Sequence, residues 1–401
     1  MLVGVFMNKL YLFNSDADLA LADFTDHYMA PALIRQMSDD LALLPLWYAL
    51  PGSAVIAASA YNLAFLKQMK SWFDMQVELV TWSELVGDGG WKLLPWGWSP
   101  SLKKRFIKKS ISEDVLPIHS DLVTLRCLAS RERALKVLEG CQNLPQVCGS
   151  GVVLFSVEDC RNYWTHHHGC CVFKAPWSGS GKGLLWCYSD FSDSVAGWCR
   201  HILTIQGTII GMPIYNKVCD FAMEFISDGQ GSVSFAGYSW FDTNAKGAYQ
   251  GNWLASDSMI EKRLSGYVKL SNLTVIREQV QKLLVEFYGQ YQGYLGVDML
   301  ICQQADQSYA VCPCIEVNLR MNMGVVARIF ADRYLKHESV GYFKVEAFAT
   351  SLDLQQAHEA DLAAHPLVVD NGKLLEGYLP LVPVTPHSRY RAYVKAVASK
   401  K

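Results

Sequence analysis

The stretch Ile315-Glu-Val-Asn-Leu-Arg320 says most about the fold of this 401-residue chain. Side chains of a β-strand point alternately to the two faces of a sheet. An extended chain therefore places Glu316, Asn318 and Arg320 on one face and apolar residues on the other. This alternation favours a half-buried strand, and a surface strand with a Glu–Arg pair is the alternative. Arg320 can neutralise phosphoryl or carboxylate charge from this face.

A hairpin is expected upstream of this strand. Leu295–Ile301 is strand-like, and the polar segment Ala305–Ser308 is expected to reverse the chain. Folding about that turn brings Asp298 close to Glu316. Two carboxylates then converge with the amide oxygen of Asn318, and hard oxygen ligands of this kind suit Mg²⁺. Pro313, inside the hairpin, predicts a bulge or an edge strand.

A second candidate site follows the predicted strand Cys171–Lys174. It reads Lys174-Ala-Pro-Trp-Ser-Gly-Ser-Gly-Lys-Gly183. Glycines let the backbone approach an anion, and consecutive N–H groups can bind its charge. Lys174 supplies a point charge for phosphate oxygens. The loop is not a Walker A motif, because Gly183 follows Lys182 where that motif requires Ser or Thr. A plain β-turn with an exposed lysine is the alternative.

Together, these two features resemble the ATP-grasp superfamily, which includes D-alanine–D-alanine ligase, biotin carboxylase and glutathione synthetase. The resemblance covers roughly residues 120–330, and the order of the motifs agrees. It implies that ATP phosphates lie under a small-residue loop and that the last two strands hold Mg²⁺. The implied phosphate-binding residues are Lys174, Ser178, Gly179, Ser180, Gly181 and Gly183. The implied metal ligands are Asp298, Glu316 and Asn318.

The resemblance implies three further features. Arg131, near the start of the helix before the grasp, is a candidate phosphate ligand where the family usually has Lys. An interlobe hinge is expected at about Ile209–Tyr215. The ribose-binding Glu of the family is absent there, and Gly211 or Met212 takes its place. The candidate adenine-binding residues are Ile210, Met212 and Pro213.

The expected fold class is α/β, with α+β grasp lobes behind an N-terminal open α/β domain. Before residue 110, strand-like and helix-like segments alternate, which favours a mainly parallel sheet. The strands are expected at Lys9–Phe13, Ala54–Ala58 and Val77–Thr81, the helices at Pro31–Leu44 and Asn62–Phe73, and a long loop at Gly87–Pro100. The expected domains are a pre-ATP-grasp domain (1–120), an N-lobe (121–208), a C-lobe (209–340) and a C-terminal extension packed on the body (341–401).

Two helices are expected in the grasp region. Ser130 is a suitable N-cap for one helix and Gly140 a suitable stop. Apolar residues recur at helical spacing over Asn272–Tyr288.

Several weaker candidates have two interpretations each. Asp220 or Glu224 can line the cleft or be a cross-strand surface charge. The polar loop Asn244–Asn252 can close on substrate through Lys246 and Tyr249, although a surface loop is favoured.

Two further groups are assigned the plainer role. Asp16 and Asp18 follow the first strand, where a helix N-cap is favoured over a substrate contact. His166–His168 is read as an exposed turn rather than a zinc site.

Composition excludes several classes. No run reaches the roughly 18 apolar residues of a membrane-spanning helix. The net charge of −2, with no basic tract beyond Lys103–Lys109, argues against nucleic acid as a partner. All 12 cysteines lie after residue 120 without paired CxxC spacing, and no export signal is evident at Met1–Met7. We therefore expect reduced thiols and a cytoplasmic location, and the many aromatic residues are compatible with a homodimer.

The expected function is an Mg-ATP-dependent ligase that joins a small-molecule carboxylate to an amine, or to a thiol, through an acyl phosphate. Lys174 and Arg320 are the expected catalytic residues. An ATP-grasp kinase or phosphotransferase and a non-catalytic nucleotide-binding protein are the alternatives. No motif outside these sites identifies the substrates.

Overall fold

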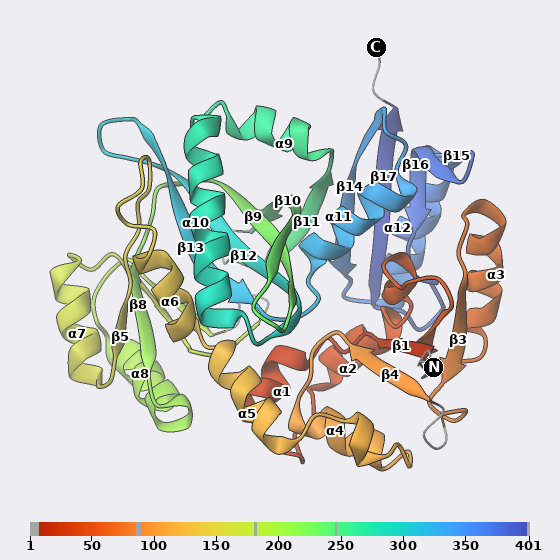
Figure 1. Ribbon diagram of the computed structural model, residues 1–401, viewed down its shortest axis with the longest axis horizontal. Helices are drawn as coiled ribbons and strands as arrows, with labels where there is room; N and C mark the ends of the chain where they lie inside the picture. Colours follow the sequence, from red (N-terminus) through yellow and green to blue (C-terminus); the bar gives the residue numbers. More distant parts are fainter. Residues whose placement is uncertain (1–7, 86–89, 180–182, 245–246, 399–401) are drawn as a thin grey trace, which may run out of the picture. The chain divides into compact units, whose positions relative to one another are not determined.

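The structure, a computed structural model, describes residues 8–85, 90–179, 183–244 and 247–398. The chain forms two compact units (Figure 1). Unit 1 contains residues 1–122, 250–256 and 325–401, and unit 2 contains residues 123–249 and 257–324. The finer division into four domains remains a prediction.

The first part of unit 1 is the predicted open α/β layer. Its sheet has the order β3-β2-β1-β4, and every neighbouring pair is parallel. The strands are β1 (Asn8–Leu12), β2 (Ser53–Ala57), β3 (Val77–Thr81) and β4 (Trp91–Pro95). The helices are α1 (Ala17–Asp23), α2 (Ala32–Asp40), α3 (Asn62–Trp72) and α4 (Pro100–Ile107), with 3₁₀ turns η1 (Leu44–Trp47) and η2 (Glu113–Val115). Helix α5 (His119–Leu128) begins in unit 1 and continues into unit 2.

Two predictions for this layer were wrong about where an element begins or ends. The segment expected as a loop over Gly87–Pro100 contains β4, which pairs with β1 along its whole length. Leu93 of β4 is buried in the core beside Leu10, so tertiary burial overrides the turn-forming composition. The helix expected over Pro31–Leu44 ends at Asp40, and the buried apolar residues after it belong to η1 and the turn before it.

The second part of unit 1 is antiparallel. Its strand order is β11-β14-β17-β16-β15. The strands are β11 (Tyr249–Leu254), β14 (Ser339–Ala347), β15 (Val368–Asp370), β16 (Lys373–Pro380) and β17 (Tyr390–Ala398), and the helices are α11 (Met323–Tyr334) and α12 (Ser351–Ala364). The second half of the loop expected over Asn244–Asn252 is therefore strand β11.

Unit 2 begins with a four-stranded antiparallel sheet of order β5-β8-β6-β7. The strands are β5 (Val152–Leu154), β6 (Cys171–Lys174), β7 (Leu184–Cys187) and β8 (Ile209–Pro213), and the helices are α6 (Arg131–Glu139), α7 (Val157–His166) and α8 (Asp193–Gln206). Ser130 caps α6 by accepting from the N–H of Glu132, and Gly140 follows its last residue, as predicted.

The second sheet of unit 2 has the order β13-β12-β9-β10. The strands are β9 (Lys217–Asp228), β10 (Val233–Thr243), β12 (Gln292–Gln303) and β13 (Tyr309–Asn318), and the helices are α9 (Asp257–Leu264) and α10 (Leu270–Tyr288). Odd-numbered residues in the middle of β9 and β12, such as Met223 and Val297, are completely buried. The even-numbered residues Glu224 and Asp298 lie on the opposite face of the sheet. Together with Glu316 they form what we call the acidic face, which contains the candidate site.

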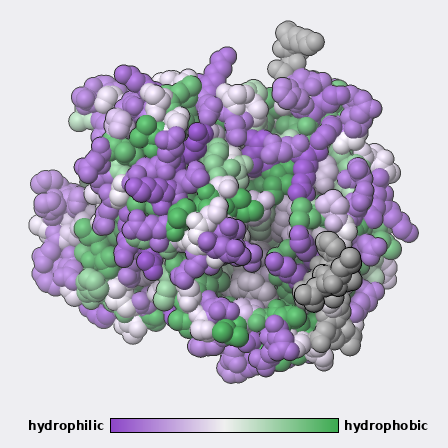
Figure 2. Space-filling view, in the orientation of Figure 1, coloured by the Kyte–Doolittle hydropathy of each residue, from purple (hydrophilic) through white to green (hydrophobic). Residues whose placement is uncertain are grey.

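Hydrophilic side chains cover most of the face seen in Figure 2, with smaller apolar areas between them. Within the described ranges, no helix combines the length and the apolar character needed to cross a membrane.

Candidate functional site

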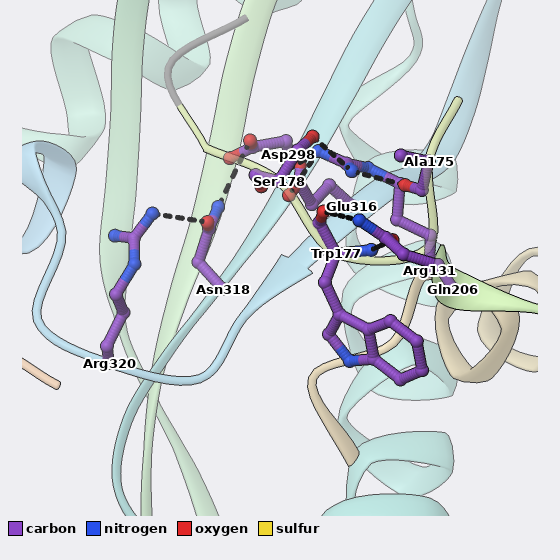
Figure 3. A network of polar contacts seen from close by, with 9 residues as sticks. All are labelled: Arg131, Ala175, Trp177, Ser178, Gln206, Asp298, Glu316, Asn318 and Arg320. Carbon is purple, nitrogen blue, oxygen red and sulfur yellow. Dashed lines mark hydrogen bonds and ion pairs between the residues drawn. The ribbon is translucent and has the colours of Figure 1, made fainter. Parts of the chain in front are cut away.

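Asp298 and Glu316 are direct partners across the β12–β13 hairpin. The amide of Asn318 lies beside them and donates to Asp298 Oδ2 at 3.1 Å (Figure 3). The pairing of β12 with β13 is irregular just after Asp298, and β13 is the edge strand of its sheet. Both features agree with the bulge or edge strand predicted from Pro313. The hairpin thus brings together the two carboxylates and the amide oxygen that the sequence placed there.

Arg320 lies just beyond this strand. β13 ends at Asn318, two residues earlier than expected, because the chain bends at Arg320. The guanidinium still reaches back and donates to Asn318 Oδ1 at 3.2 Å and to the carbonyl of Met321 at 3.0 Å. A positive group therefore stands at the end of the acidic face, although it does not continue the strand.

The electrostatics of this face suit a cation. Burial, helped by the neighbouring charge of Glu316, raises the pKa of Asp298 to about 7 against the opposing effects of Asn318 and Arg320. Two close carboxylates without a cation repel each other, and a divalent ion would remove that cost. Among the described residues, no three His, Cys, Asp or Glu side chains form a metal-binding group. Asn318, waters and phosphate oxygens would therefore have to complete a magnesium shell, as is common for Mg²⁺.

Two buried polar residues extend the face. Glu224 on β9 and Asn318 on β13 both lie opposite Gly296 on β12. Asn322 Nδ2 donates to Glu224 Oε2 at 3.1 Å. Burial, helped by the charge of Asp298, raises the pKa of Glu224 to about 8. Glu224 is therefore part of the acidic face and not a surface charge.

Asn322 was not expected at this site from the sequence. It continues the even-numbered polar series of Glu316, Asn318 and Arg320, and that spacing was the available signal. Gly296 and Gly324 leave room for the Glu224–Asn322 pair, since a Cβ at either glycine would clash with a Glu224 carboxylate oxygen.

Lys174 and Arg131 both lie close to Glu316. Lys174 ends β6 and is 6% exposed. Burial, helped by the charge of Arg131, lowers the pKa of Lys174 to about 8, while Glu316 opposes the shift. Arg131 NH2 donates to Glu316 Oε1 at 2.8 Å. Two basic groups from the first sheet and its helix thus meet the acidic face of the second sheet within unit 2.

Arg131 also holds the loop after Lys174. Its guanidinium donates to the carbonyl of Ala175 at 2.7 Å and to Ser178 Oγ at 2.7 Å (Figure 3). Gly183 has φ +72° and its carbonyl accepts from the N–H of Ala175 at 2.9 Å, which closes the loop. Of the other predicted loop residues, Gly179 is described, whereas Ser180, Gly181 and Lys182 lie outside the described residues.

Comparison of the sequence with protein-family models and with curated proteins finds no match. Solved structures do match along nearly the whole chain. One is biotin carboxylase from Campylobacter jejuni in a complex named as β,γ-ATP, with a TM-score of 0.51, 12% identity, and coverage of 98% of this chain and 88% of that chain. The chain has the ATP-grasp fold.

Two further matches carry related names. N5-carboxyaminoimidazole synthetase from Staphylococcus aureus, complexed with ADP, matches with a TM-score of 0.50, 11% identity, and coverage of 99% and 94%. The biotin carboxylase domain of 2-oxoglutarate carboxylase from Hydrogenobacter thermophilus, with MgADP and bicarbonate, matches less closely, with a TM-score of 0.45 and 14% identity. The match covers 68% of this chain and only 63% of that one. At such identities the likeness concerns the ATP-grasp fold alone.

The predicted hinge of the ATP-grasp fold is largely a strand. Ile210 pairs with Val153 on one side and with Lys174 on the other, and Met212 pairs with Val172. β5 pairs with β8 only from Ile209 to Gly211, and Met212 and Pro213 pair with β6 alone. Only residues 214–216 connect β8 to β9. The adenine role of Ile210, Met212 and Pro213 stays a prediction.

Apart from Glu224, the structure describes two of the three weaker candidates on and after β9. Asp220 is buried and accepts from Lys217 Nζ and Thr243 Oγ1, both at 2.6 Å. Burial, helped by the charges of Asp242 and Glu224, raises the pKa of Tyr249 well above its usual value. Lys246 lies outside the described residues.

The remaining candidates are the aspartates after β1 and the histidine run. Asp16 occupies the N-cap position of α1, but its side chain makes no capping hydrogen bond. Asp18 lies in the first turn of that helix. His166 ends α7, and the other two histidines lie in the turn after it.

Proposed function

We propose that this protein binds Mg-ATP and uses it to join a carboxylate to an amine or a thiol. The observation that carries the proposal is the pairing of Asp298 with Glu316, with Asn318 alongside and Lys174 nearby, on an ATP-grasp fold. Two solved structures of this fold are named as complexes with ADP and with β,γ-ATP. Their substrates are not transferred to this chain.

Each group has a defined role in the proposal. Asp298, Glu316 and Asn318 hold magnesium, which when bound neutralises triphosphate charge and positions the phosphates. Lys174 and the loop Ser178–Gly183 bind phosphate oxygens. Arg320 stabilises the negative charge on the phosphoryl group as it is transferred.

The proposed reaction has two steps. A carboxylate oxygen of the first substrate attacks the γ-phosphorus, and the bond from that phosphorus to the leaving oxygen of ADP breaks. A nucleophilic nitrogen or sulfur then attacks the carbonyl carbon of the acyl phosphate, and inorganic phosphate leaves. Positioning and charge neutralisation supply most of the catalysis, so the chain needs no nucleophilic side chain.

Binding of Mg-AMPPNP, a non-hydrolysable ATP analogue, tests the nucleotide site. Lys174→Met and Glu316→Gln are each expected to weaken it by about tenfold or more, since each removes a charged partner. Lys282→Met and Glu286→Gln on the exposed face of α10 are matched controls that keep wild-type affinity. Wild-type affinity in both site variants would contradict the proposal.

Hydroxylamine trapping tests the chemistry. A ligase incubated with ATP and its carboxylate substrate yields a hydroxamate from the acyl phosphate, and the same mixture with the amine yields an amide and ADP. Release of ADP with a phosphorylated product that hydroxylamine does not cleave would indicate a phosphotransferase. Binding of Mg-AMPPNP without ATP turnover across a panel of carboxylates would indicate a non-catalytic nucleotide-binding protein.

A further inference from the structure

Four consecutive carbonyl groups of the loop after Lys174 are bound by two side chains and one backbone N–H. Arg131 donates from its guanidinium to the carbonyls of Ala175, at 2.7 Å, and Ser178, at 3.3 Å. Its backbone N–H donates to the carbonyl of Pro176 at 3.0 Å. Gln206 Nε2 donates to the carbonyl of Trp177 at 3.1 Å. Each carbonyl oxygen from 175 to 178 thus points at a protein donor.

Gln206 makes a second contact with the same residue. Its Oε1 accepts from the N–H of Trp177 at 2.9 Å, so one amide side chain satisfies both backbone groups of one loop residue (Figure 3). A two-point contact fixes the orientation of a peptide group as well as its position.

Gln206 belongs to a helix that packs into a buried core. Gln206 is the last residue of α8, which packs into a buried core through Ala196, Cys199 and Ile202. Gly207, with φ +86°, ends the helix immediately after it.

Trp177 is held from its side chain as well. Its indole Nε1 donates to the carbonyl of Arg126 at 2.7 Å, and the Arg126 guanidinium lies 4.4 Å from the centre of the Trp177 ring. Trp177 is therefore bound through its N–H, its carbonyl and its ring. Such a residue anchors a loop and does not move freely with a ligand.

The direction of the carbonyls matters for an anion-binding loop. A carbonyl oxygen carries partial negative charge and repels phosphate, whereas an N–H attracts it. A loop rich in small residues can turn either group toward a ligand, because its backbone is permissive. Donors that bind every carbonyl of one stretch select the conformation in which none of them faces the anion.

We infer that Arg131 and Gln206 are positioning residues that hold the carbonyls of Ala175–Ser178 away from the nucleotide phosphates. Arg131 then acts on ATP through the loop and through Glu316, and not as a direct phosphate ligand. This inference rests on the proposed nucleotide site and adds Gln206, which no sequence motif singles out. It also replaces the role expected for Arg131 from the sequence.

Gln206→Met tests the role of Gln206, because it keeps the length of the side chain and removes both hydrogen bonds to Trp177. The affinity for Mg-AMPPNP is expected to fall about tenfold, and the weak affinity for adenosine, which has no phosphates, is expected to stay unchanged. Gln206→Glu keeps the acceptor but sets a carboxylate oxygen against the Trp177 carbonyl, so it weakens Mg-AMPPNP binding too. Gln281→Met, which removes a hydrogen bond to the carbonyl of Val233 at 2.7 Å, is the matched control and keeps wild-type affinity.

Arg131→Lys separates the two roles of Arg131. Lysine keeps the positive charge but cannot bind the two carbonyls and Ser178 Oγ together. The inferred role predicts a loss of about tenfold or more in Mg-AMPPNP affinity. A direct phosphate ligand predicts near wild-type affinity in this variant.

The outcomes distinguish the inference from the function on which it rests. If the wild-type protein binds Mg-AMPPNP and both Gln206 variants bind it equally well, the inference fails while the nucleotide site stands. If Arg131→Lys binds normally, the part concerning Arg131 fails. If the wild-type protein binds no Mg-AMPPNP at all, the proposed function fails and the inference fails with it. Melting temperatures within a few degrees of the wild type establish that each variant is folded.

Discussion

Asp298 on β12 and Glu316 on β13 are directly paired across an antiparallel ladder, with their carboxylates on the same face of the sheet. Like charges placed opposite each other destabilise a sheet, and the neighbouring Glu316 contributes to the raised pKa of Asp298. Arg131 offsets part of this repulsion through its contact with Glu316. The arrangement disfavours the ligand-free protein and favours a bound cation.

Asp298→Asn is therefore expected to separate stability from metal-dependent binding. At pH 8 the free energy of unfolding should stay level or rise by about 1 kcal/mol, because one of two opposed charges is removed. The magnesium-dependent part of Mg-AMPPNP affinity should fall by about tenfold or more. Urea unfolding and calorimetric titration with and without Mg²⁺ measure the two effects. A strong loss of stability at pH 8 would contradict the repulsion argument.

Nucleotide binding is expected to take up a proton at Lys174. The pKa of Lys174 in the free protein is about 8, so at pH 8 about half of the molecules carry a neutral amine. Bound phosphate favours the charged form, which requires uptake of about half a proton at that pH. Titration with Mg-AMPPNP in buffers of different ionisation enthalpy measures the uptake. Lys174→Arg, whose side chain stays charged, is the control in which this uptake disappears.

Glu224→Gln is expected to change how stability depends on pH. The pKa of Glu224 is near 4.3 in an unfolded chain and about 8 in the folded protein, so the folded state binds the proton more tightly. The wild type therefore loses stability at Glu224 as pH rises from about 4.3 to 8, by at most about 1.4 kcal/mol per pH unit. The stability of Glu224→Gln relative to the wild type should rise across this range. A difference between Glu224→Gln and the wild type that stays flat across this range would refute the prediction.

Gly324→Ala is expected to lower the free energy of unfolding by about 1–3 kcal/mol. A Cβ at Gly324 would clash with Glu224 Oε1 and with Ser239 Oγ. The loss should be smaller in a Glu224→Ala background, which removes one of the clashing groups.

Gly197→Ala is the matched control for this substitution. Gly197 lies inside α8, and nothing lies within 4 Å of the position of an added Cβ. Alanine there should stabilise the protein by about 0.5–1 kcal/mol. Thermal and urea unfolding measure both variants, and equal effects at the two glycines would exclude a specific role for the space at Gly324.

Local patterns predicted the parts of the site that depend on neighbouring residues in the chain. Alternation along β13 predicted the common face of Glu316 and Asn318, and the polar turn predicted the approach of Asp298. The helix that follows Ser130 was also predicted, because capping is a local interaction. Strand β4 was missed, since its residues are held by parallel pairing with β1, which lies far away in the sequence.

The acidic strand pair, its hairpin and the order of the motifs were determined by the sequence itself, since period-two alternation and turn chemistry act over a few residues. Tertiary structure alone decided which long-range partners these residues have. It buried Glu224 against Asn322, used β8 as an interior strand where a hinge was expected, and turned Arg131 and Gln206 onto the carbonyls of the loop. Burial and hydrogen bonding between distant segments depend on how sheets and helices pack, and no local pattern in the sequence encodes that packing.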